Sequence, residues 1–129
     1  MAKLLIPALL VAALAMPNAS ADRRNRVPAA TPTGPAESCI SLRSIRQTRV
    51  RSDRVIDFEM TGRRTYRVTL PQACPNLGFE ERFSYGTSLS QLCQQDIITV
   101  LQMGGPGLQR GASCGLAPFQ PVRLARERR

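Results

Sequence analysis

Residues 55–70 have the sequence VIDFEMTGRRTYRVTL, and this stretch decides the fold. Apolar and polar side chains alternate on both sides of a central Thr-Gly-Arg-Arg segment, with the period of two that is typical of β-strands. The glycine suits a tight loop, so the stretch predicts a β-hairpin. The apolar face would carry Ile56, Phe58, Met60, Tyr66, Val68 and Leu70, and the outward face Val55, Asp57, Glu59, Thr65, Arg67 and Thr69.

The register of this hairpin follows from matching the two faces, because a slip of one residue would turn every apolar side chain into water. We predict that Phe58 pairs with Val68. The same register places Glu59 opposite Arg67, which is a favourable cross-strand charge pair. It leaves Asp57 on the outward face, where we expect it to be exposed to solvent.

The N-terminus has the features of an export signal. Lys3 supplies a basic start, residues 4–16 form an apolar run, and Ala19-Ser-Ala21 is a small-x-small cleavage site. The run is shorter than the roughly 20 apolar residues that a membrane span needs. We therefore predict that residues 1–21 are a signal peptide, that the mature protein is periplasmic or secreted, and that it has no membrane span after cleavage.

Three segments follow the signal peptide. Residues 22–38 are rich in Pro, Gly, Ala and Thr and predict a disordered lead, whereas residues 123–129 form a short basic tail. Between them, residues 39–122 predict one β domain, in which residues 96–103 are the clearest further strand. The fold class is therefore mainly β, a small antiparallel barrel or sandwich of five to six short strands, stapled by two disulfides.

The four cysteines, Cys39, Cys74, Cys93 and Cys114, are separated by 35, 19 and 21 positions. This spacing contains neither the C-x₂₋₄-C pattern of a structural zinc site nor a C-x-x-C redox motif, so no metal or cofactor is predicted. In an exported protein such cysteines predict two disulfides, for which three pairings are possible. We favour Cys74–Cys93, which would close the loop after the hairpin, together with Cys39–Cys114, which would tie the ends of the domain.

Six short motifs lie around the cysteines and the hairpin: Cys39-Ile40, Asp57-Phe58, Tyr66-x-Val68-x-Leu70, Cys74-Pro75-x-Leu77, Leu92-Cys93-x-x-Asp96-x-Ile98-x-Val100 and Cys114-x-Leu116-x-x-Phe119. With these motifs the chain resembles a family of small exported four-cysteine bacterial proteins that is classed only as a domain of unknown function. The resemblance spans about residues 39–122. It implies membership of that fold and an envelope location, and it brings no activity or binding residues.

The composition restricts the chemistry. The chain contains no His, and its single lysine, Lys3, lies in the predicted signal peptide. An imidazole base, a Ser-His or Cys-His nucleophile and a catalytic lysine are therefore excluded from the mature protein. Carboxylates remain: Asp57 and Glu59 lie two residues apart on one strand face, about 7 Å apart, as in a glycosidase pair. A small carboxylate-dependent hydrolase is thus the enzymatic alternative, although we predict no catalytic residue.

Charge gives the remaining clue to function. The chain has 18 basic and 9 acidic residues, a net charge of +9. Guanidinium groups bind phosphates and carboxylates well, so the closely spaced Arg43, Arg46, Arg49 and Arg51 are candidate anion-binding residues. With only six aromatic residues and no recognition motif, nucleic acid is not the predicted partner.

These observations predict a non-enzymatic binding or accessory protein of the cell envelope. Its partner would be an anionic envelope surface or another envelope protein. An Arg-rich module that docks on anionic envelope polymers is a further alternative. If the positive charge has no role in binding, it serves only to keep the protein soluble.

Overall fold

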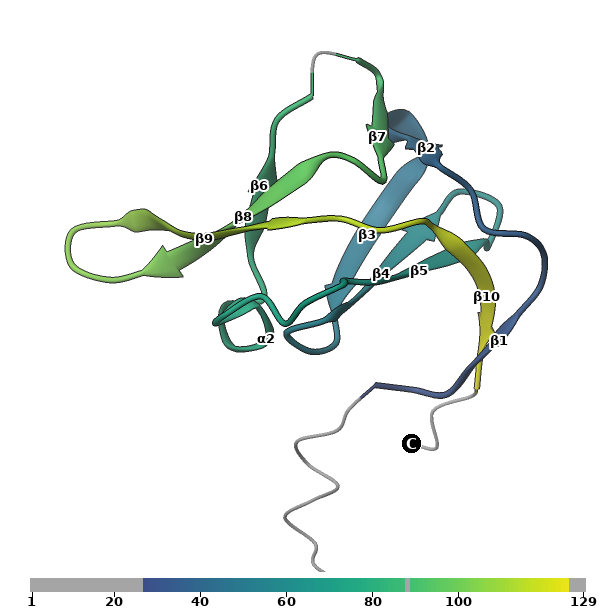
Figure 1. The fold of residues 1–129 in the computed structure, drawn as a ribbon, viewed down its shortest axis with the longest axis horizontal. Helices are drawn as coiled ribbons and strands as arrows, with labels where there is room; N and C mark the ends of the chain where they lie inside the picture. The colour runs from purple at the N-terminus through teal and green to yellow at the C-terminus, as the bar shows by residue number, and fades with distance from the viewer. Residues whose placement is uncertain (1–26, 88, 126–129) are drawn as a thin grey trace, which may run out of the picture.

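The computed structural model describes residues 27–87 and 89–125, which are built almost entirely of short strands (Figure 1). The elements are β1 (Ala30–Pro32), β2 (Cys39–Ser41), a 3₁₀ turn η1 (Leu42–Ser44), β3 (Ile45–Val50), β4 (Val55–Met60), β5 (Thr65–Thr69), α2 (Leu77–Glu80), β6 (Phe83–Tyr85), β7 (Gln91–Cys93), β8 (Ile97–Met103), β9 (Leu108–Gly115) and β10 (Gln120–Leu124).

The strands form three antiparallel sheets. The largest has the order β1-β10-β5-β4-β3, the second has the order β6-β8-β9, and β2 pairs with β7 in the third. The β8–β9 hairpin extends away from the rest of the molecule, and α2 lies beside β8 (Figure 1). The predicted mainly β fold is thus confirmed, and of the two predicted architectures the sandwich-like one is observed.

The core lies between the sheets and is centred on Phe58 of β4. Its ring makes edge-to-face contacts with Phe119, at a centroid distance of 5.6 Å, and with Phe83, at 6.5 Å. Such geometry adds to the stabilisation that burial of the rings already gives. The predicted apolar face of the hairpin is confirmed, because all six of its members are buried: Ile56, Phe58, Met60, Tyr66, Val68 and Leu70.

The predicted register of the β4–β5 hairpin is wrong by two residues. Phe58 pairs with Tyr66 rather than with Val68, and Asp57 rather than Glu59 lies opposite Arg67. The turn explains the difference. Met60 N donates to Arg64 O at 2.8 Å, and the loop inside this pair is tight because Gly62 and Arg63 both have positive φ, 79° and 60°. A shift of two residues preserves the faces, which is why matching the faces did not reveal it.

The predicted disordered lead contains an ordered strand, so that prediction is wrong for the described residues 27–38. Strand β1 pairs with β10, Thr33 N donates to Pro121 O at 3.0 Å, and Glu37 and Phe119 exchange two backbone hydrogen bonds of 2.8 Å. These bonds use backbone groups and distant partners, and neither leaves a periodicity in the sequence. The domain therefore begins before residue 39, while residues 22–26 lie outside the described range.

The described residues form ten strands, more than the five to six predicted. In the second half, β6, β7, β9 and β10 join β8, which covers most of the strand predicted over residues 96–103. Four of the ten strands, β1, β2, β6 and β7, have three residues each. A strand of three residues is too short to show alternation, so the sequence underestimates their number.

Both disulfides form, but the favoured pairing is wrong. The observed bridges are Cys39–Cys93 and Cys74–Cys114. The first joins residues that lie directly opposite each other in the β2–β7 pair. The second links Cys74, in the segment after β5, to Cys114 of β9. The backbone N–H of Cys74 also donates to Asp53 O at 2.7 Å. Contacts between segments that are distant in the chain, rather than loop closure along the chain, thus decide the pairing.

Two disulfides indicate that the chain folds in an oxidising compartment outside the cytoplasm. Among residues 27–87 and 89–125, no helix is long and apolar enough to cross a membrane. The predicted signal peptide, residues 1–21, lies outside the described residues, as does the end of the predicted basic tail after residue 125. Arg123 and Leu124 of that tail belong to β10.

Candidate functional site

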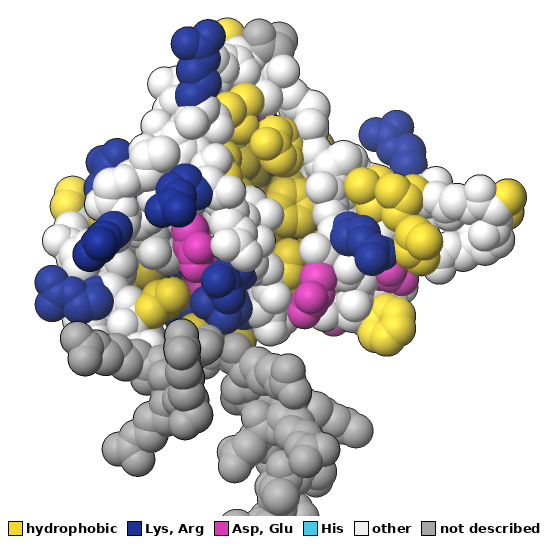
Figure 2. Space-filling view, turned by 180° about the vertical axis from the view of Figure 1, so that it is seen from behind, with side chains coloured by type: hydrophobic (Ala, Val, Ile, Leu, Met, Phe, Trp, Pro, Cys, Tyr) yellow, Lys and Arg dark blue, Asp and Glu magenta, His cyan; other side chains and the backbone are white. Residues whose placement is uncertain are grey.

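Every cationic side chain in residues 27–87 and 89–125 is an arginine, because the chain has no histidine and its single lysine is Lys3. Figure 2 shows basic side chains over the broad part of the molecule and also beside the projecting end, with hydrophobic side chains in the middle of this face and around the projecting end. The four predicted anion-binding residues lie on η1, on β3 and just after β3, and the structure gives them three different environments. They are therefore described separately.

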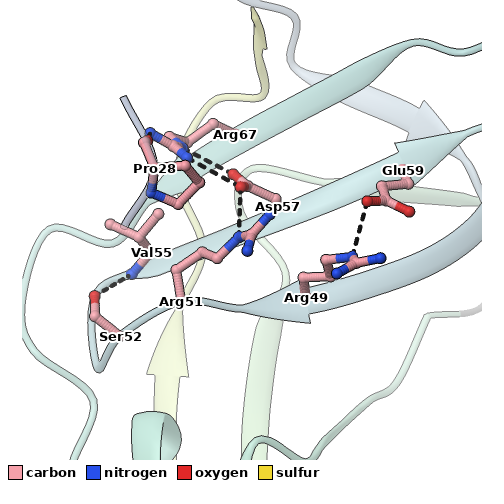
Figure 3. Close-up of polar contacts among 8 residues, drawn as sticks. All are labelled: Pro28, Arg49, Arg51, Ser52, Val55, Asp57, Glu59 and Arg67. Carbon is pink, nitrogen blue, oxygen red and sulfur yellow. Dashed lines mark hydrogen bonds and ion pairs between the residues drawn. The ribbon is translucent and has the colours of Figure 1, made fainter. Parts of the chain in front are cut away.

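Arg51 takes part in a buried cluster around Asp57 of β4 (Figure 3). Its Nε atom donates to Asp57 Oδ2 at 3.0 Å. From β5, Arg67 donates to the same carboxylate twice, from Nε at 2.8 Å and from Nη2 at 3.0 Å. Arg67 Nη1 also donates to Pro28 O at 2.8 Å, which fastens the N-terminal segment over this face of the sheet. We call Arg51, Asp57 and Arg67 the buried triad.

The burial of Asp57 contradicts its predicted exposure. Its side chain is 0% exposed, while those of Arg51 and Arg67 are 12% and 13% exposed. Both carboxylate oxygens are occupied by guanidinium hydrogen bonds. A general acid or base must reach the substrate directly or through one water molecule. The proposed catalytic pair of Asp57 and Glu59 is therefore not available in this structure.

The other three predicted residues lie at the surface. Arg49 Nε is 2.9 Å from Glu59 Oε1, with side chains 45% and 31% exposed, so this is a surface ion pair (Figure 3). Arg43 and Arg46 are exposed, and neither forms an ion pair with another residue in the described part of the chain. The predicted anion-binding group is thus divided into one structural arginine, one paired arginine and two available ones.

The structure brings together a second group of arginines that sequence analysis did not identify. Arg63 and Arg64 lie in the β4–β5 turn, and Arg123 lies on β10. All three line one cavity of about 400 Å³, which we call the three-arginine cavity. Its remaining lining consists of Thr33, Thr65, Tyr66, Pro121, Val122 and Leu124.

Strand pairing explains how these arginines meet. Val122 of β10 pairs with Thr65 of β5, so the same register continued by one residue places Arg123 opposite Arg64. Like charges at directly opposite positions destabilise a sheet. No carboxylate lines the three-arginine cavity in the described structure. The arrangement therefore brings three cationic residues together at a cavity whose lining contains no carboxylate.

The backbone at Arg63 adds to this unusual arrangement. Its φ of 60° is in the left-handed region, which costs a non-glycine residue about 1 to 2 kcal/mol and which Gly or Asn tolerates better. Residues held in such conformations often cluster at functional sites. An arginine at this position is thus unfavourable both for the turn and for the local electrostatics.

Tyr66 contributes a polar atom beside the three-arginine cavity. Its pKa is raised above the ordinary value of 10.0, mainly because the side chain is buried, and also because it donates a hydrogen bond to the negatively charged Glu37. The positive charge of Arg64 acts in the opposite direction. Tyr66 is therefore neutral near pH 7, and its hydroxyl group already donates a hydrogen bond to Glu37.

Other kinds of site find less support in the described residues. Within residues 27–87 and 89–125, no group of three or more His, Cys, Asp or Glu residues could hold a metal ion. The chain matches no protein-family model, no curated protein and no solved structure. The resemblance to the four-cysteine family therefore stays a prediction, and the geometry of this chain has to carry any proposal about its function.

Only one local signal could have indicated the three-arginine cavity. Arg63 and Arg64 are adjacent in the turn of the clearest hairpin, so the sequence alone places two guanidinium groups near each other. Arg123 belongs to the segment predicted to be a tail, and the neighbouring Val122 pairs with Thr65, which lies 57 positions earlier in the chain. Its contribution depends on the pairing of β10 with β5, which no periodicity in the sequence specifies.

Proposed function

We propose that this protein is an exported, non-enzymatic binding module of the cell envelope, and that the three-arginine cavity holds an anionic group of its partner. The group is a phosphate or a carboxylate, because these are the anions with which guanidinium groups form two parallel hydrogen bonds. The periplasm or the exterior of the cell is the proposed location, in keeping with the two disulfides.

The observation that carries this proposal is the convergence of Arg63, Arg64 and Arg123 on one cavity that no carboxylate lines. Such a group repels itself when empty, so an anion that binds there removes an electrostatic cost as well as gaining hydrogen bonds. Thr33 and Thr65 supply hydroxyl donors beside the guanidinium groups. The cavity thus has cations and neutral donors around a space large enough for a small anionic group.

The contrast with the buried triad supports this interpretation. The arginines of the triad already have a carboxylate between them, whereas those of the cavity line a space without one. Chemistry beyond binding would require a base or an ionised nucleophile at the cavity. Tyr66 is the only titratable group in its lining besides the arginines, and its raised pKa keeps it protonated near neutral pH.

Titration with two defined anions tests the proposal. Tripolyphosphate and citrate would be added to the oxidised protein at low salt, and binding would be followed by calorimetry and by the chemical shifts of the residues around the cavity. We expect saturable binding of at least one anion, with the shifts concentrated at Arg63, Arg64, Thr65 and Arg123. Tighter binding of tripolyphosphate would indicate a phosphate group on the partner, and tighter binding of citrate would indicate a carboxylate group. Affinity should fall as ionic strength rises, because exposed charges are screened.

A matched pair of triple variants separates the cavity from general basicity. The first carries Arg63→Asn, Arg64→Gln and Arg123→Gln, where asparagine is chosen because it tolerates a positive φ. The second carries Arg43→Gln, Arg46→Gln and Arg110→Gln, three exposed arginines outside the cavity. We expect the first to weaken anion binding at least about tenfold, which corresponds to the loss of one charged hydrogen bond, and the second to change it little. Equal losses in both variants, or no binding by the wild type, would overturn the proposal.

A further inference from the structure

Strand β3 forms one edge of the five-stranded sheet, opposite β1. On one side it pairs with β4, and on the other side no strand of the described structure pairs with it. Residues 46–49 are all exposed. An edge strand of this kind presents unpaired backbone N–H and C=O groups, which can pair with a further strand.

The hydrogen bonds of β3 show which backbone groups face outward. Arg51 N donates to Val55 O at 2.8 Å, so Arg51 faces β4. Backbone groups alternate in direction along an antiparallel strand, so those of Gln47 and Arg49 also face β4, opposite Glu59 and Asp57. The N–H and C=O groups of Thr48 and Val50 consequently point away from the sheet. The backbone groups of these two residues can therefore form hydrogen bonds with another strand.

The charge around this edge is strongly positive. Arg43 and Arg46 are exposed and lack ion pairs with described residues, and the side chain of Arg49 is 45% exposed beside Glu59. Positive side chains on an edge strand normally prevent association of identical chains, because two copies would bring the same charges together. The same charges attract an acidic strand, and this combination of repulsion and attraction is how specific edges select a partner.

We propose that the β3 edge is a docking site for an extended acidic segment of another protein, which adds to the sheet as a further strand through Thr48 and Val50. The partner is acidic because Arg46 and Arg49 lie on β3 and Arg43 lies on η1 directly before it, and all three are exposed. The chain's own ends outside the described residues are basic in sequence, so they do not suit this edge. This proposal is independent of the three-arginine cavity.

Hydrogen exchange with defined peptides tests the mode of binding. The probe is an eight-residue peptide of alternating glutamate and threonine, and the control replaces each glutamate with lysine. We expect only the acidic peptide to bind, and we expect it to slow amide exchange at Thr48 and Val50 by at least about tenfold. The amides of Gln47 and Arg49, which already face β4, should change little. Electrostatic attraction without strand addition would not produce this alternation.

Backbone methylation of the peptide provides a second test. Two acidic peptides would be made, each methylated at every second amide, in the two possible alternations. Strand addition uses the amides on one edge of the peptide only. One methylated peptide should therefore lose binding, while the other should retain most of it. Equal binding of both would overturn strand addition and leave a purely electrostatic contact.

Variants of the protein complete the design. Thr48→Pro removes an N–H that points away from β4, and proline is tolerated on edge strands, so the β3–β4 pair should persist. We expect it to weaken peptide binding about tenfold relative to Thr48→Ala, which keeps the N–H. If Thr48→Pro fails to fold, the exchange pattern of the wild type decides whether a strand is added.

Arg43→Gln with Arg46→Gln should also weaken peptide binding, whereas the cavity variant of Arg63, Arg64 and Arg123 should not. A peptide that binds the wild type without protecting Thr48 and Val50 would refute the proposal.

Discussion

The two arginine groups of this protein lie on the same sheet and differ in what faces them. In the buried triad, Arg51 and Arg67 donate three hydrogen bonds to Asp57, whose side chain is 0% exposed. In the three-arginine cavity, the three arginines line a space of about 400 Å³ with no carboxylate in its lining. The comparison teaches that residue type and local spacing do not distinguish a structural arginine from an available one. The position of the nearest carboxylate distinguishes the two kinds of arginine, and strand register decides that position.

The largest expected effect concerns the centre of the buried triad. Asp57→Ala leaves two guanidinium groups nearly buried without their carboxylate, so we expect the free energy of unfolding to fall by about 3 to 5 kcal/mol. Denaturant unfolding of the oxidised protein measures it. Glu59→Ala, on the same strand face, is the control and should cost less than about 1 kcal/mol. Similar losses in the two variants would show that the triad does not differ energetically from a surface pair.

The next effect separates the two arginines of the triad. Arg67→Gln removes two hydrogen bonds to Asp57 and the bond to Pro28 O, so we expect a loss of about 2 to 3 kcal/mol. Amide exchange at Thr33 should also become faster, because Arg67 fastens the N-terminal segment that leads into β1. Arg51→Gln keeps the bond from Arg67 to Pro28 O, so it should leave amide exchange at Thr33 unchanged. If exchange at Thr33 is the same in both variants, the contact with Pro28 does not hold this segment in place.

A smaller effect is expected for the surface pair of Arg49 and Glu59. Both side chains are partly exposed, at 45% and 31%, so solvent screens their attraction. A double-mutant cycle with Arg49→Gln and Glu59→Gln should give a coupling energy of about 0.2 to 1 kcal/mol, which decreases as salt is added. A coupling as large as the loss from Asp57→Ala would remove the distinction between buried and exposed pairs.

The smallest effect on stability is expected at the three-arginine cavity. Replacement of Arg63, Arg64 and Arg123 by Asn, Gln and Gln removes like charges and keeps the turn, so the free energy of unfolding should stay within about 0.5 kcal/mol of the wild type or rise. Denaturant unfolding at low salt measures it. A loss of several kcal/mol would show that these arginines serve the fold, and the proposed role in binding would lose its basis.

Sequence analysis predicted the inner surface of the fold better than its outer surface. The apolar alternation of residues 55–70 identified the hairpin and its buried face, and the four cysteines predicted two disulfides. Burial depends on hydrophobicity at a fixed period, which each strand shows by itself. The exposure of Asp57, the order in residues 27–38 and the cysteine pairing were predicted wrongly, because each depends on a partner in another part of the chain.

The candidate site shows the same limit. Arg43, Arg46, Arg49 and Arg51 form a group in the sequence, but the structure gives them three different environments. The three-arginine cavity joins a turn to a strand that was expected to be a tail. Only Arg63 and Arg64 are neighbours in the sequence, so the cavity becomes visible once β10 pairs with β5.

The sequence by itself determined that this protein is a β-rich, disulfide-bonded, basic chain without histidine, because composition and a period of two are local properties. Only the tertiary structure decided which charges are used by the fold and which remain available. A shift of two residues in the β4–β5 pair keeps every apolar side chain inside, yet it exchanges Glu59 for Asp57 as the partner of Arg67. The hydrophobic effect fixes the faces of a strand, whereas turn geometry and cross-strand hydrogen bonds fix its neighbours.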